Sequence, residues 1–471
     1  MEYPMHIGGR LVTTDRPLKV ELPYDGSEIA TVYEAGREHV EAAVEAAWAA
    51  APVMREMTLA ERSAILRKAH DKVLERSESL ALALSSESGK PIREARAEVD
   101  RAAQTLLFSS EEAHRLCGEV VPMDASPAGK GRWGMTLREP VGVISAITPF
   151  NFPLNLSMHK IGPAVAAGNA VVHKPASATP VTALMMAGIF DECGLPKGAL
   201  NVITGPGGTV GDLLVTHPKV SMITFTGSPE VGLRIRSLAG MKRVTLELGS
   251  NSAVIIEEDA DLDAAVPRCI RGSFSNSGQV CISVQRIFAH SRVHGEFLER
   301  MVEGTRKLKI GHPHEPSTDI SSLITVKEAE RVEGWIEEAT KAGARLCIGG
   351  ARRRATVNPA ILERVPTEVK ISCKEAFGPV VAINEAGSLD EAIDWVNASE
   401  YGLQASIYTR DLQKAFHAAR KVHVGGFLIN EVPAYRLDQM PYGGVKLSGM
   451  GREGPKYAVE EMTEIKLVSW R

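Results

Sequence analysis

The feature that most constrains this chain is an alternation of short β-branched runs with helical stretches that begins near residue 141. Strands are expected at 141–147, 170–173, 201–204, 222–226, 244–246 and 253–256, with helices near 154–167, 180–193, 209–216 and 229–238. Strand and helix in this order predict a parallel, doubly wound sheet. Such sheets bind ligands at the carboxyl ends of their strands. Residues that follow a predicted strand are therefore the first functional candidates.

The rest of the chain adds helices and a second α/β alternation. Residues up to 116 are expected to be mostly helical after a short strand-like start, and Thr58-Leu-Ala-Glu61 is a capping-box signature. Further helices are expected near 262–273, 295–308, 326–342 and 389–397, and further strands near 287–289, 380–383 and 427–429. This second alternation predicts a second α/β domain. The segments 118–139 and 465–471 fit neither core and are expected to form arms that pair with another subunit.

Composition limits the partners. With 471 residues, 44% of them apolar, the chain can bury more than one core, and the length suggests roughly three folding units. The net charge of −4 favours neither nucleic acid nor an anionic membrane. No apolar run reaches the about 18 residues of a membrane helix, and no export signal is visible. We therefore expect a cytoplasmic protein with a small polar ligand.

The cysteines and histidines predict neither a disulfide framework nor a metal site. The six cysteines form no C-x-x-C pair, which disfavours a zinc ribbon or a redox dithiol. His312 and His314 flank Pro313 in a turn-like stretch, so we expect them to be exposed to solvent rather than to bind a metal.

Two glycine-containing turns follow predicted strands. The stretch Gly205-Pro-Gly207-Gly208-Thr-Val-Gly211 is close to the dinucleotide fingerprint, but Val210 takes the place of its last glycine. A turn that lets a helix pack close to a strand would explain the same glycines. In Thr226-Gly227-Ser228-Pro229 a strand gives way to a helix whose free N–H groups could face a phosphate. Two such turns in one sheet are stronger evidence for a nucleotide than one.

Three side chains are candidates for chemistry. Cys281 lies in the small, polar stretch Ser275-Asn-Ser-Gly-Gln-Val-Cys281-Ile-Ser, which suits a partly exposed nucleophile, although a buried structural cysteine is the alternative. Glu247 ends an apolar strand. An α/β sheet places its active groups at such a strand end, so Glu247 is a candidate for catalysis, and a surface salt bridge is the alternative. Asn151 begins a helix after a strand and either caps it or contacts a ligand.

Taken together, these segments resemble the aldehyde dehydrogenase superfamily along essentially the full length of the chain. The stretches 146–156 and 281–285 are most similar to the lactaldehyde dehydrogenases, relatives of the non-phosphorylating glyceraldehyde and phosphonoacetaldehyde dehydrogenases. The matching motifs are Thr148-Pro-Phe-Asn151-Phe-Pro153, Gly168-Asn-Ala-Val-Val-His-Lys174-Pro-Ala-Ser177, Phe225-Thr-Gly227-Ser228, Leu246-Glu247-Leu-Gly249, Gly278-Gln279-Val-Cys281, Glu375-Ala-Phe377-Gly-Pro379 and Met440-Pro-Tyr-Gly-Gly-Val-Lys446-Leu-Ser-Gly449.

The resemblance implies an α/β fold of the aldehyde dehydrogenase type. A Rossmann-like NAD(P)-binding domain would comprise residues 1–118 and 140–248, and an α/β catalytic domain residues 249–440. Residues 119–139 and 441–471 would form a β-arm for oligomerisation and a C-terminal segment. The resemblance also implies a homo-oligomer, either a dimer or a homotetramer.

The resemblance further implies roles in catalysis. Cys281 would attack the aldehyde to form a thiohemiacetal and then a thioester. The Asn151 amide and the Cys281 backbone N–H would stabilise the oxyanion. Glu247 would be the general base that activates water to hydrolyse the thioester.

A cofactor site for NADP and/or NAD follows from the same resemblance. Lys174 would hold the adenine ribose, Gly227 and Ser228 would approach the pyrophosphate, and Glu375 and Phe377 would contact the nicotinamide ribose and ring. The site is also expected to include Ile147, Thr148, Pro149, Phe150, Ser177, Gly207, Gly211, Phe225, Thr226 and Leu248. NAD-selective relatives often carry glutamate where this chain has Ser177, and serine removes the repulsion of a 2′-phosphate. NADP is therefore expected to be accepted.

The expected substrate is a small polar aldehyde. His159 lies slightly more than two helical turns after Asn151 and could look toward the substrate. Arg436 precedes the 441–444 segment, where the family places a loop of the substrate tunnel, and would pair either with a polar group of the substrate or in a loop-bracing or intersubunit salt bridge.

Three other functions are weighed against this one. A coenzyme A-acylating relative would not need Glu247. A catalytically silent binding or structural member of the superfamily should have lost Cys281, Glu247 or Asn151. A thiol-dependent esterase would not need the Lys174 and Gly227-Ser228 motifs.

Overall fold

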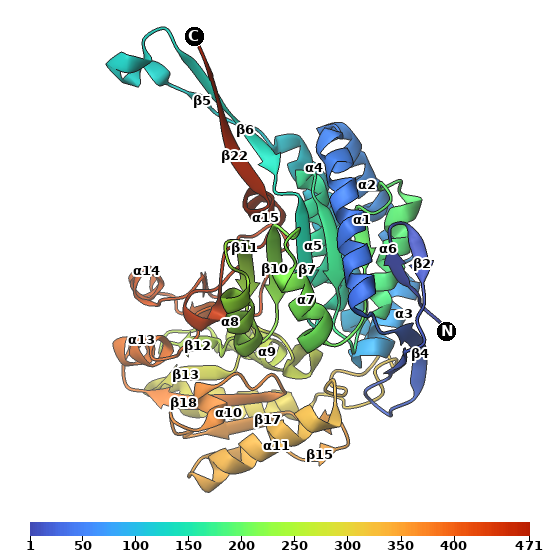
Figure 1. The fold of residues 1–471 in the computed structure, drawn as a ribbon. Coiled ribbons are helices and arrows are strands. Elements are labelled where there is room, and N and C mark those ends of the chain that lie inside the picture. The colour runs from blue at the N-terminus through green and yellow to red at the C-terminus, as the bar shows by residue number, and fades with distance from the viewer.

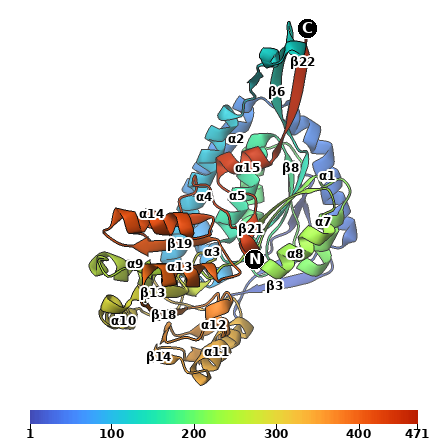
Figure 2. The same cartoon turned by 90° about the vertical axis from the view of Figure 1, so that its left-hand side faces the viewer.

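Two large sheets and a projecting arm organise the chain, and the computed structural model describes all residues from 1 to 471 (Figure 1). The arm rises away from both sheets, and the C-terminus lies at its tip (Figures 1 and 2). No helix has the length and apolarity that crossing a membrane requires. No group of three or more His, Cys, Asp or Glu side chains is placed to hold a metal ion.

The first sheet has eight strands in the order β2-β1-β9-β8-β7-β10-β11-β21. Its five central strands, from β9 to β11, are parallel, and the remaining strands pair antiparallel at the two edges. The strands are β1 (Met5–Ile7), β2 (Arg10–Val12), β7 (Val143–Ile147), β8 (Ala170–Lys174), β9 (Leu200–Val202), β10 (Met222–Thr226), β11 (Arg243–Glu247) and β21 (Gly449–Met450). The predicted doubly wound sheet is confirmed.

The order of the central strands places the ligand crevice. The chain runs from β7 outward through β8 and β9, and then returns to the other side of β7 with β10 and β11. The strand order therefore reverses between β7 and β10, which is where open α/β sheets bind ligands. Ile147 at the end of β7 pairs with Lys174 on β8 and with Phe225 on β10, while Thr226 pairs with Glu247 on β11. The predicted functional residues at these strand ends thus lie along one edge.

Helices cover both faces of the first sheet. Helix α5 (Pro153–Ala167) is buried along its whole length because it lies between the sheet and α4 (Ile92–Arg115). The capping box predicted at residues 58–61 is present at the start of α2, where Thr58 and Glu61 bond each other's backbone N–H. The helices of this part are α1 (Arg37–Glu56), α2 (Leu59–Glu75), α3 (Ser77–Ser88), α4, α5, α6 (Val181–Glu192), α7 (Asp212–Thr216), α8 (Pro229–Leu238) and α15 (Pro455–Glu461). The strands β3 (Pro17–Glu21) and β4 (Glu28–Tyr33) form a separate antiparallel pair.

The second sheet has seven strands in the order β14-β17-β18-β13-β12-β19-β20, all parallel except β14. Helices α9 and α10 cover one face, and α11, α13 and α14 cover the other. The strands are β12 (Ala253–Ile256), β13 (Arg286–His290), β14 (Arg345–Ile348), β17 (Ala360–Glu363), β18 (Val380–Ala386), β19 (Gln404–Tyr408) and β20 (Gly426–Ile429), and the helices are α9 (Leu262–Phe274), α10 (Ser291–Arg306), α11 (Val326–Lys341), α13 (Leu389–Asn397) and α14 (Leu412–Lys421). Smaller elements are β15 (Arg352–Arg353), β16 (Thr356–Val357) and α12 (Lys370–Cys373).

A three-stranded antiparallel sheet forms the arm, with β6 (Trp133–Pro140) between β22 (Thr463–Trp470) and β5 (Val120–Val121). Strands β22 and β6 pair along their full length, from Thr463 opposite Pro140 to Trp470 opposite Trp133. These strands lie within or beside the two segments that fit neither predicted core. The arm exposes several apolar side chains, namely Trp133, Met135, Leu137, Ile465, Leu467 and Trp470.

The pair of histidines at 312 and 314 corrects a prediction, because both are half-buried rather than exposed. Pro313 is buried and its carbonyl accepts a hydrogen bond from the backbone N–H of Ile92 at the start of α4. His314 Nε2 lies 3.1 Å from the hydroxyl oxygen of Ser86. The His312 ring lies edge-on to Tyr24, with 5.0 Å between the ring centroids.

Candidate active site

A cavity of about 400 Å³ lies where α4 and the start of α5 face α9 and the loop after β20. Phe152, Val280 and Arg436 are among its lining residues, and Phe152 and Cys281 both pack against an apolar cluster that contains Val280 and Tyr442. The cavity therefore leads toward the cysteine that the sequence singled out.

The backbone before Cys281 is bent by three consecutive residues in the left-handed region. Asn276, Ser277 and Gly278 have φ values of 48°, 53° and 75°. A Cβ atom at Gly278 would lie 2.0 Å from the carbonyl oxygen of Gly378, so only glycine fits there. This bend ends α9 and carries the following residues into the space between the two large sheets.

The Cys281 thiol is partly covered and has one polar partner. Its Sγ lies 3.0 Å from the hydroxyl oxygen of Tyr442. Burial raises the pKa of the Cys281 thiol to about 11, and the hydrogen bond from Tyr442 acts in the opposite direction. The backbone N–H of Cys281 has no acceptor within the protein, so it is free to bind an oxyanion.

Asn151 reaches the same loop. Its side-chain Nδ2 donates to the carbonyl of Gln279 at 2.9 Å, which leaves the second hydrogen of the amide without a partner. The main-chain carbonyl of Asn151 accepts hydrogen bonds from Lys90 Nζ at 2.7 Å and from Asn276 Nδ2 at 3.1 Å. These contacts hold the amide against the residues that lead to Cys281.

Glu247, the last residue of β11, is a buried carboxylate without a hydrogen-bond partner. Its side chain is buried, and neither carboxylate oxygen accepts a hydrogen bond. Burial raises the pKa of Glu247 well above its usual value, and the nearby carboxylate of Glu453 raises it further. Such a group is a stronger base than an exposed glutamate and holds no partner that would compete with water.

A further buried acid, Glu453, pairs with two of the cations around Glu247. Glu453 accepts hydrogen bonds from Lys160 at 2.9 Å and from Arg436 at 3.2 Å, and these cations lower the pKa of Glu453 to about 2. Because Lys160 and Arg436 pair with Glu453, neither cation is bonded to Glu247.

Asp438 is a second buried acid with cationic partners. It accepts two hydrogen bonds from Arg101 on α4, at 2.8 and 3.2 Å, and one from His159 Nε2 on α5 at 2.9 Å. His159 is fully buried and lies 3.3 Å from Arg436, behind it rather than among the cavity-lining residues. Arg436 does line the cavity, and its buried Nε has no acceptor.

The crevice between β7 and β10 has donors and acceptors that fit a nicotinamide dinucleotide. Lys174 is almost fully buried, yet its ammonium bonds only the neutral carbonyl of Pro175, at 3.0 Å. Burial lowers the pKa of Lys174 to about 8. A Cβ atom added at Gly207 would meet nothing within 4 Å, so the backbone is open to a ligand there, and a Cβ atom at Gly211 would lie 3.9 Å from the Lys174 side chain. A ribose hydroxyl or a phosphate would supply the missing partner.

On the far side of the crevice, Glu375 and Phe377 form a second polar and aromatic wall. The Glu375 carboxylate accepts only the backbone N–H of Ser250, at 2.9 Å, and burial raises the pKa of Glu375 to about 7. The Phe377 ring lies edge-on to Phe150, with 5.7 Å between the centroids. A carboxylate with free acceptor positions suits ribose hydroxyls.

The structure brings the remaining predicted cofactor residues to the same edge of the first sheet. Ser177 donates to the carbonyl of Gly205 at 2.9 Å, and Ser228 caps α8. Gly207 and Gly211 bound a π-helical turn just before α7. The others lie at or directly after the ends of β7, β10 and β11, namely Ile147, Thr148, Pro149, Phe225, Thr226, Gly227 and Leu248.

Several residues of this region were not predicted. Tyr442 lies in the Pro-Tyr-Gly-Gly segment, which the sequence analysis placed near the substrate tunnel. Its contact with Cys281 was not predicted. Nothing in the local sequence marks Lys90, Arg101, Asp438 or Glu453, because their partners are distant in the chain.

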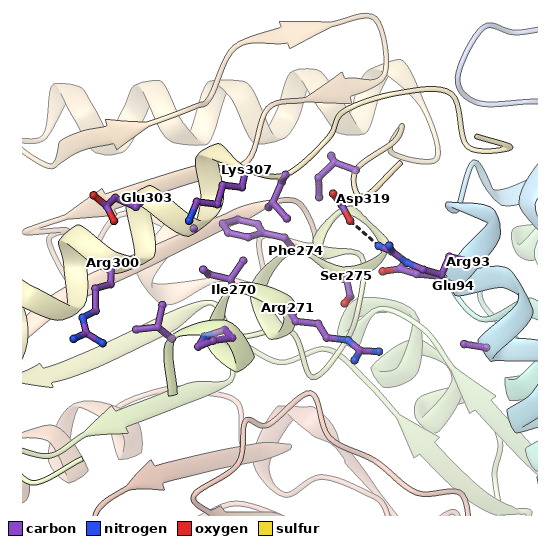
Figure 3. Close-up of a pocket in the computed structure, with 16 residues that line it drawn as sticks. Arg93, Glu94, Ile270, Arg271, Phe274, Ser275, Arg300, Glu303, Lys307 and Asp319 are labelled. Atoms are coloured by element: carbon purple, nitrogen blue, oxygen red, sulfur yellow. Dashed lines mark hydrogen bonds and ion pairs between the residues drawn. The ribbon is translucent and has the colours of Figure 1, made fainter. Parts of the chain in front are cut away.

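A second hollow, of about 660 Å³, adjoins the cavity and is drawn in Figure 3. Figure 3 shows Arg93 joined to Asp319 and Arg271 apart from that pair. Arg271 lines both hollows and makes no ion pair, nor does Lys307 in the outer one. Two cations without an ion-pair partner thus line the cavity or the hollow that adjoins it.

Comparison with known proteins decides the family. The model of the aldehyde dehydrogenase family matches residues 12–468. The chain belongs to the aldehyde dehydrogenase family. The family, the fold class and the oxidation of a small polar aldehyde with a nicotinamide cofactor, all predicted from the motifs, are thereby confirmed.

Relatives of this aldehyde dehydrogenase agree along its whole length. It is 48% identical to a 3-sulfolactaldehyde dehydrogenase of Priestia aryabhattai over 467 residues, which cover 99% of this chain and 98% of that protein. It is 40% identical to a lactaldehyde dehydrogenase of Methanocaldococcus jannaschii, with 98% and 99% covered.

Solved structures agree as well. Aldehyde dehydrogenase 21 of Physcomitrella patens, in complex with its reaction product succinate, superposes with a TM-score of 0.98 at 39% identity, covering 100% of this chain and 98% of that one. Glyceraldehyde-3-phosphate dehydrogenase GapN of Methanocaldococcus jannaschii, complexed with NADP, has a TM-score of 0.94 at 40% identity, with 97% and 100% covered.

Replacing Lys90 by Met should destabilise the enzyme strongly. The side chains of Lys90 and Glu98 are both fully buried and paired, and Glu98 also accepts the backbone N–H groups of Leu154 and Asn155 at the start of α5. The variant would leave Glu98 buried without a cation, which costs about 3–5 kcal/mol of unfolding free energy. Urea titration followed by tryptophan fluorescence measures this loss.

Lys219→Met is the matched control, because Lys219 pairs with Glu45 at the surface. Its expected cost is below about 1 kcal/mol. Equal losses for the two variants would contradict the role given to the buried pair.

Proposed function

We propose that this chain oxidises a short anionic aldehyde to its carboxylic acid by covalent catalysis at Cys281, followed by hydrolysis with Glu247 as general base. The observation that carries the proposal is the unpaired, buried carboxylate of Glu247 close to Cys281, whose thiol has a raised pKa partly because of that carboxylate. A nucleophilic thiol beside a carboxylate that has no other hydrogen-bond partner suits a reaction whose last step is hydrolysis by water.

In the first half of the reaction, the Cys281 thiolate adds to the carbonyl carbon. The new C–S bond takes the sulfur electron pair, and the carbonyl π electrons move onto oxygen. The free amide hydrogen of Asn151 and the free N–H of Cys281 would bind this oxyanion. Removing one such donor costs about 100- to 1,000-fold in rate. Bound NAD(P) supplies the acceptor for the hydride that leaves this carbon, so that a thioester remains.

In the second half, Glu247 takes a proton from a water molecule as its oxygen attacks the thioester carbon. The C–S bond then breaks, the product leaves as a carboxylic acid, and the sulfur regains its electron pair. Because the pKa of Glu247 is raised, its carboxylate is a better proton acceptor near neutral pH than an ordinary glutamate.

Two cationic side chains among the charged residues of the substrate cavity support an anionic tail on the aldehyde. Arg271 has no acidic partner, and the Nε donor of Arg436 is buried without an acceptor. A sulfonate, carboxylate or phosphate would satisfy these donors with charge-assisted hydrogen bonds. The names of two relatives point the same way, since one is a sulfolactaldehyde dehydrogenase and another was crystallised with succinate. His159, buried behind Arg436, positions that arginine instead of contacting substrate.

We also propose the predicted division into a cofactor domain (1–118 and 140–248), a catalytic domain (249–440), and an arm with a C-terminal segment (119–139 and 441–471). The arm supports assembly with a second copy of this chain, because it projects from the body (Figure 2) and because it exposes apolar side chains. A location in the cytoplasm remains part of the same proposal.

The Glu247→Gln variant should form the acyl-enzyme and then stall, because the glutamine amide cannot accept the proton of water. Rapid mixing with aldehyde and cofactor should show one NAD(P)H per active site, followed by turnover at least about 100-fold slower than in the parent enzyme. Stopped-flow absorbance of the nicotinamide measures both phases. Cys281→Ala should show neither phase. A Glu247→Gln enzyme with normal steady-state turnover would exclude Glu247 as the base.

The enzyme should use NADP, because Lys174 lies without an anionic partner and Ser177 presents no carboxylate to a 2′-phosphate. Ser177→Glu should raise the KM for NADP at least about tenfold and leave the KM for NAD within about threefold. Initial rates with each cofactor test this expectation. Ser237→Glu, a substitution on the exposed end of α8, is the control for an added negative charge. No turnover with NADP in the parent enzyme would contradict the prediction.

Substrate preference should follow the charge of the tail. We expect kcat/KM to fall in the order sulfolactaldehyde, lactaldehyde, hexanal. Arg271→Gln should reduce the ratio of kcat/KM for sulfolactaldehyde over lactaldehyde about tenfold or more, since one charge-assisted hydrogen bond contributes about 1.5–3 kcal/mol. Arg300→Gln is the control, because Arg300 lies in the outer hollow but is paired with Asp263 and Glu296.

A parent enzyme that prefers hexanal would contradict the anionic substrate. So would an Arg271→Gln enzyme with an unchanged ratio.

A further inference from the structure

Tyr442 occupies a position that the reaction as proposed so far does not use. Its side chain is almost fully buried, and its hydroxyl oxygen lies 3.0 Å from Cys281 Sγ. The guanidinium of Arg436 lies 3.6 Å from the centroid of the Tyr442 ring. The phenol is thus held between the cysteine sulfur at its hydroxyl end and a cation on its face.

The ionisation state of Cys281 decides which of the two atoms donates the hydrogen bond. Burial raises the pKa of Tyr442 well above its usual value, and the negative charges of Cys281 and Glu247 act in the same direction. When Cys281 is a thiolate its sulfur carries no proton, so the phenol, whose pKa is raised, is then the donor of this hydrogen bond.

The Cys281 thiolate needs such a donor. The charged groups that face it are the carboxylates of Glu247 and Glu375, which disfavour the thiolate, and the guanidinium of Arg436, which favours it. The hydrogen bond from Tyr442 is the contact that most opposes the effect of burial. No histidine or lysine is bonded to the sulfur.

We propose that Tyr442 is a further catalytic residue, whose hydroxyl donates a hydrogen bond to the sulfur of Cys281 and stabilises the thiolate that attacks the aldehyde. Arg436 strengthens this donor, because a cation on the ring face draws electron density from the phenol. When the sulfur bonds to carbon and loses its negative charge, the hydrogen bond weakens. The inference rests on the proposed function, since it takes Cys281 as the nucleophile.

The same arrangement links substrate to nucleophile. Arg436 lines the cavity and has a free Nε donor, and its guanidinium also lies on the Tyr442 ring. The residue that would hold the anionic tail of the substrate therefore also sets the orientation of the phenol that bonds the sulfur.

The test is the pH dependence of Cys281 alkylation by iodoacetamide, a neutral reagent that reacts with the thiolate and displaces iodide. Peptide mass spectrometry follows the labelling of each cysteine in the parent enzyme and in Tyr442→Phe. This substitution removes the hydroxyl and leaves the ring beneath Arg436. The midpoint for Cys281 should rise by about one pH unit, because a hydrogen bond to a charged group contributes about 1.5–3 kcal/mol. Labelling below both midpoints should then slow about tenfold.

Cys347 and Cys373 are internal controls in every sample, because neither contacts Tyr442 and both are partly accessible. Unchanged profiles for these two thiols would show that Tyr442→Phe is folded. Tyr33→Phe, at the surface, controls for loss of a hydroxyl elsewhere. Arg436→Gln is a second variant that removes both the direct effect of the guanidinium on the thiolate and its effect on the phenol, so the Cys281 midpoint should rise.

An unchanged or lowered midpoint for Cys281 in Tyr442→Phe would overturn the proposal, and so would an unchanged midpoint in Arg436→Gln if Tyr442→Phe failed to fold. Full turnover after complete alkylation of Cys281 would be a different result. It would overturn the proposed function itself, and with it the catalytic role of Tyr442. The two failures are therefore distinguishable in one experiment.

Discussion

The buried ion pairs that Asp438 and Glu453 make with the first sheet's helices are the interaction on which the active-site geometry depends. Asp438 binds Arg101 on α4, and Glu453 binds Lys160 on α5. Both acids belong to the segment that follows β20, so these pairs fasten it to α4 and α5. Asp438 and Glu453 are both buried, so removing the cation of either pair would leave a buried carboxylate less compensated, which costs more than losing a surface salt bridge. The segment that carries Tyr442 is held in place by these pairs.

The same pairs explain how one enclosed site can hold several charged groups with different tasks. Glu453 forms ion pairs with Lys160 and Arg436, and these cations lower its pKa. Glu247 has no such partner, and burial raises its pKa. Two buried carboxylates thus have opposite pKa shifts, an arrangement that separates a structural acid from a catalytic base. The thiol of Cys281, disfavoured as a thiolate by burial, depends on Tyr442 for its one hydrogen bond. The positions of the charged groups around Cys281 and Glu247 therefore prepare this site for covalent chemistry.

Much of the fold could be predicted because the central strands of the first sheet are buried on both faces and appear in the sequence as continuous β-branched runs. Strand β19 was missed because Gln404 and Ser406 interrupt its apolar pattern, although all five of its residues are buried. The candidate residues at strand ends could be predicted from topology and motif, since parallel strands end at one edge. The contact of Arg101 with Asp438 could not, because 337 residues separate the pair and neither has a local pattern that marks it.

The most direct test of the account is the mass of the Cys281 peptide in the Glu247→Gln enzyme, quenched with acid soon after mixing with sulfolactaldehyde and NADP. Covalent catalysis predicts that this peptide gains the mass of the acyl group in nearly every subunit, and that the other five cysteine peptides remain unmodified. When NADP is left out, no adduct with the mass of the oxidised acyl group should form on Cys281. Oxidation of the aldehyde with no adduct on Cys281, or with the adduct on another residue, would contradict the account.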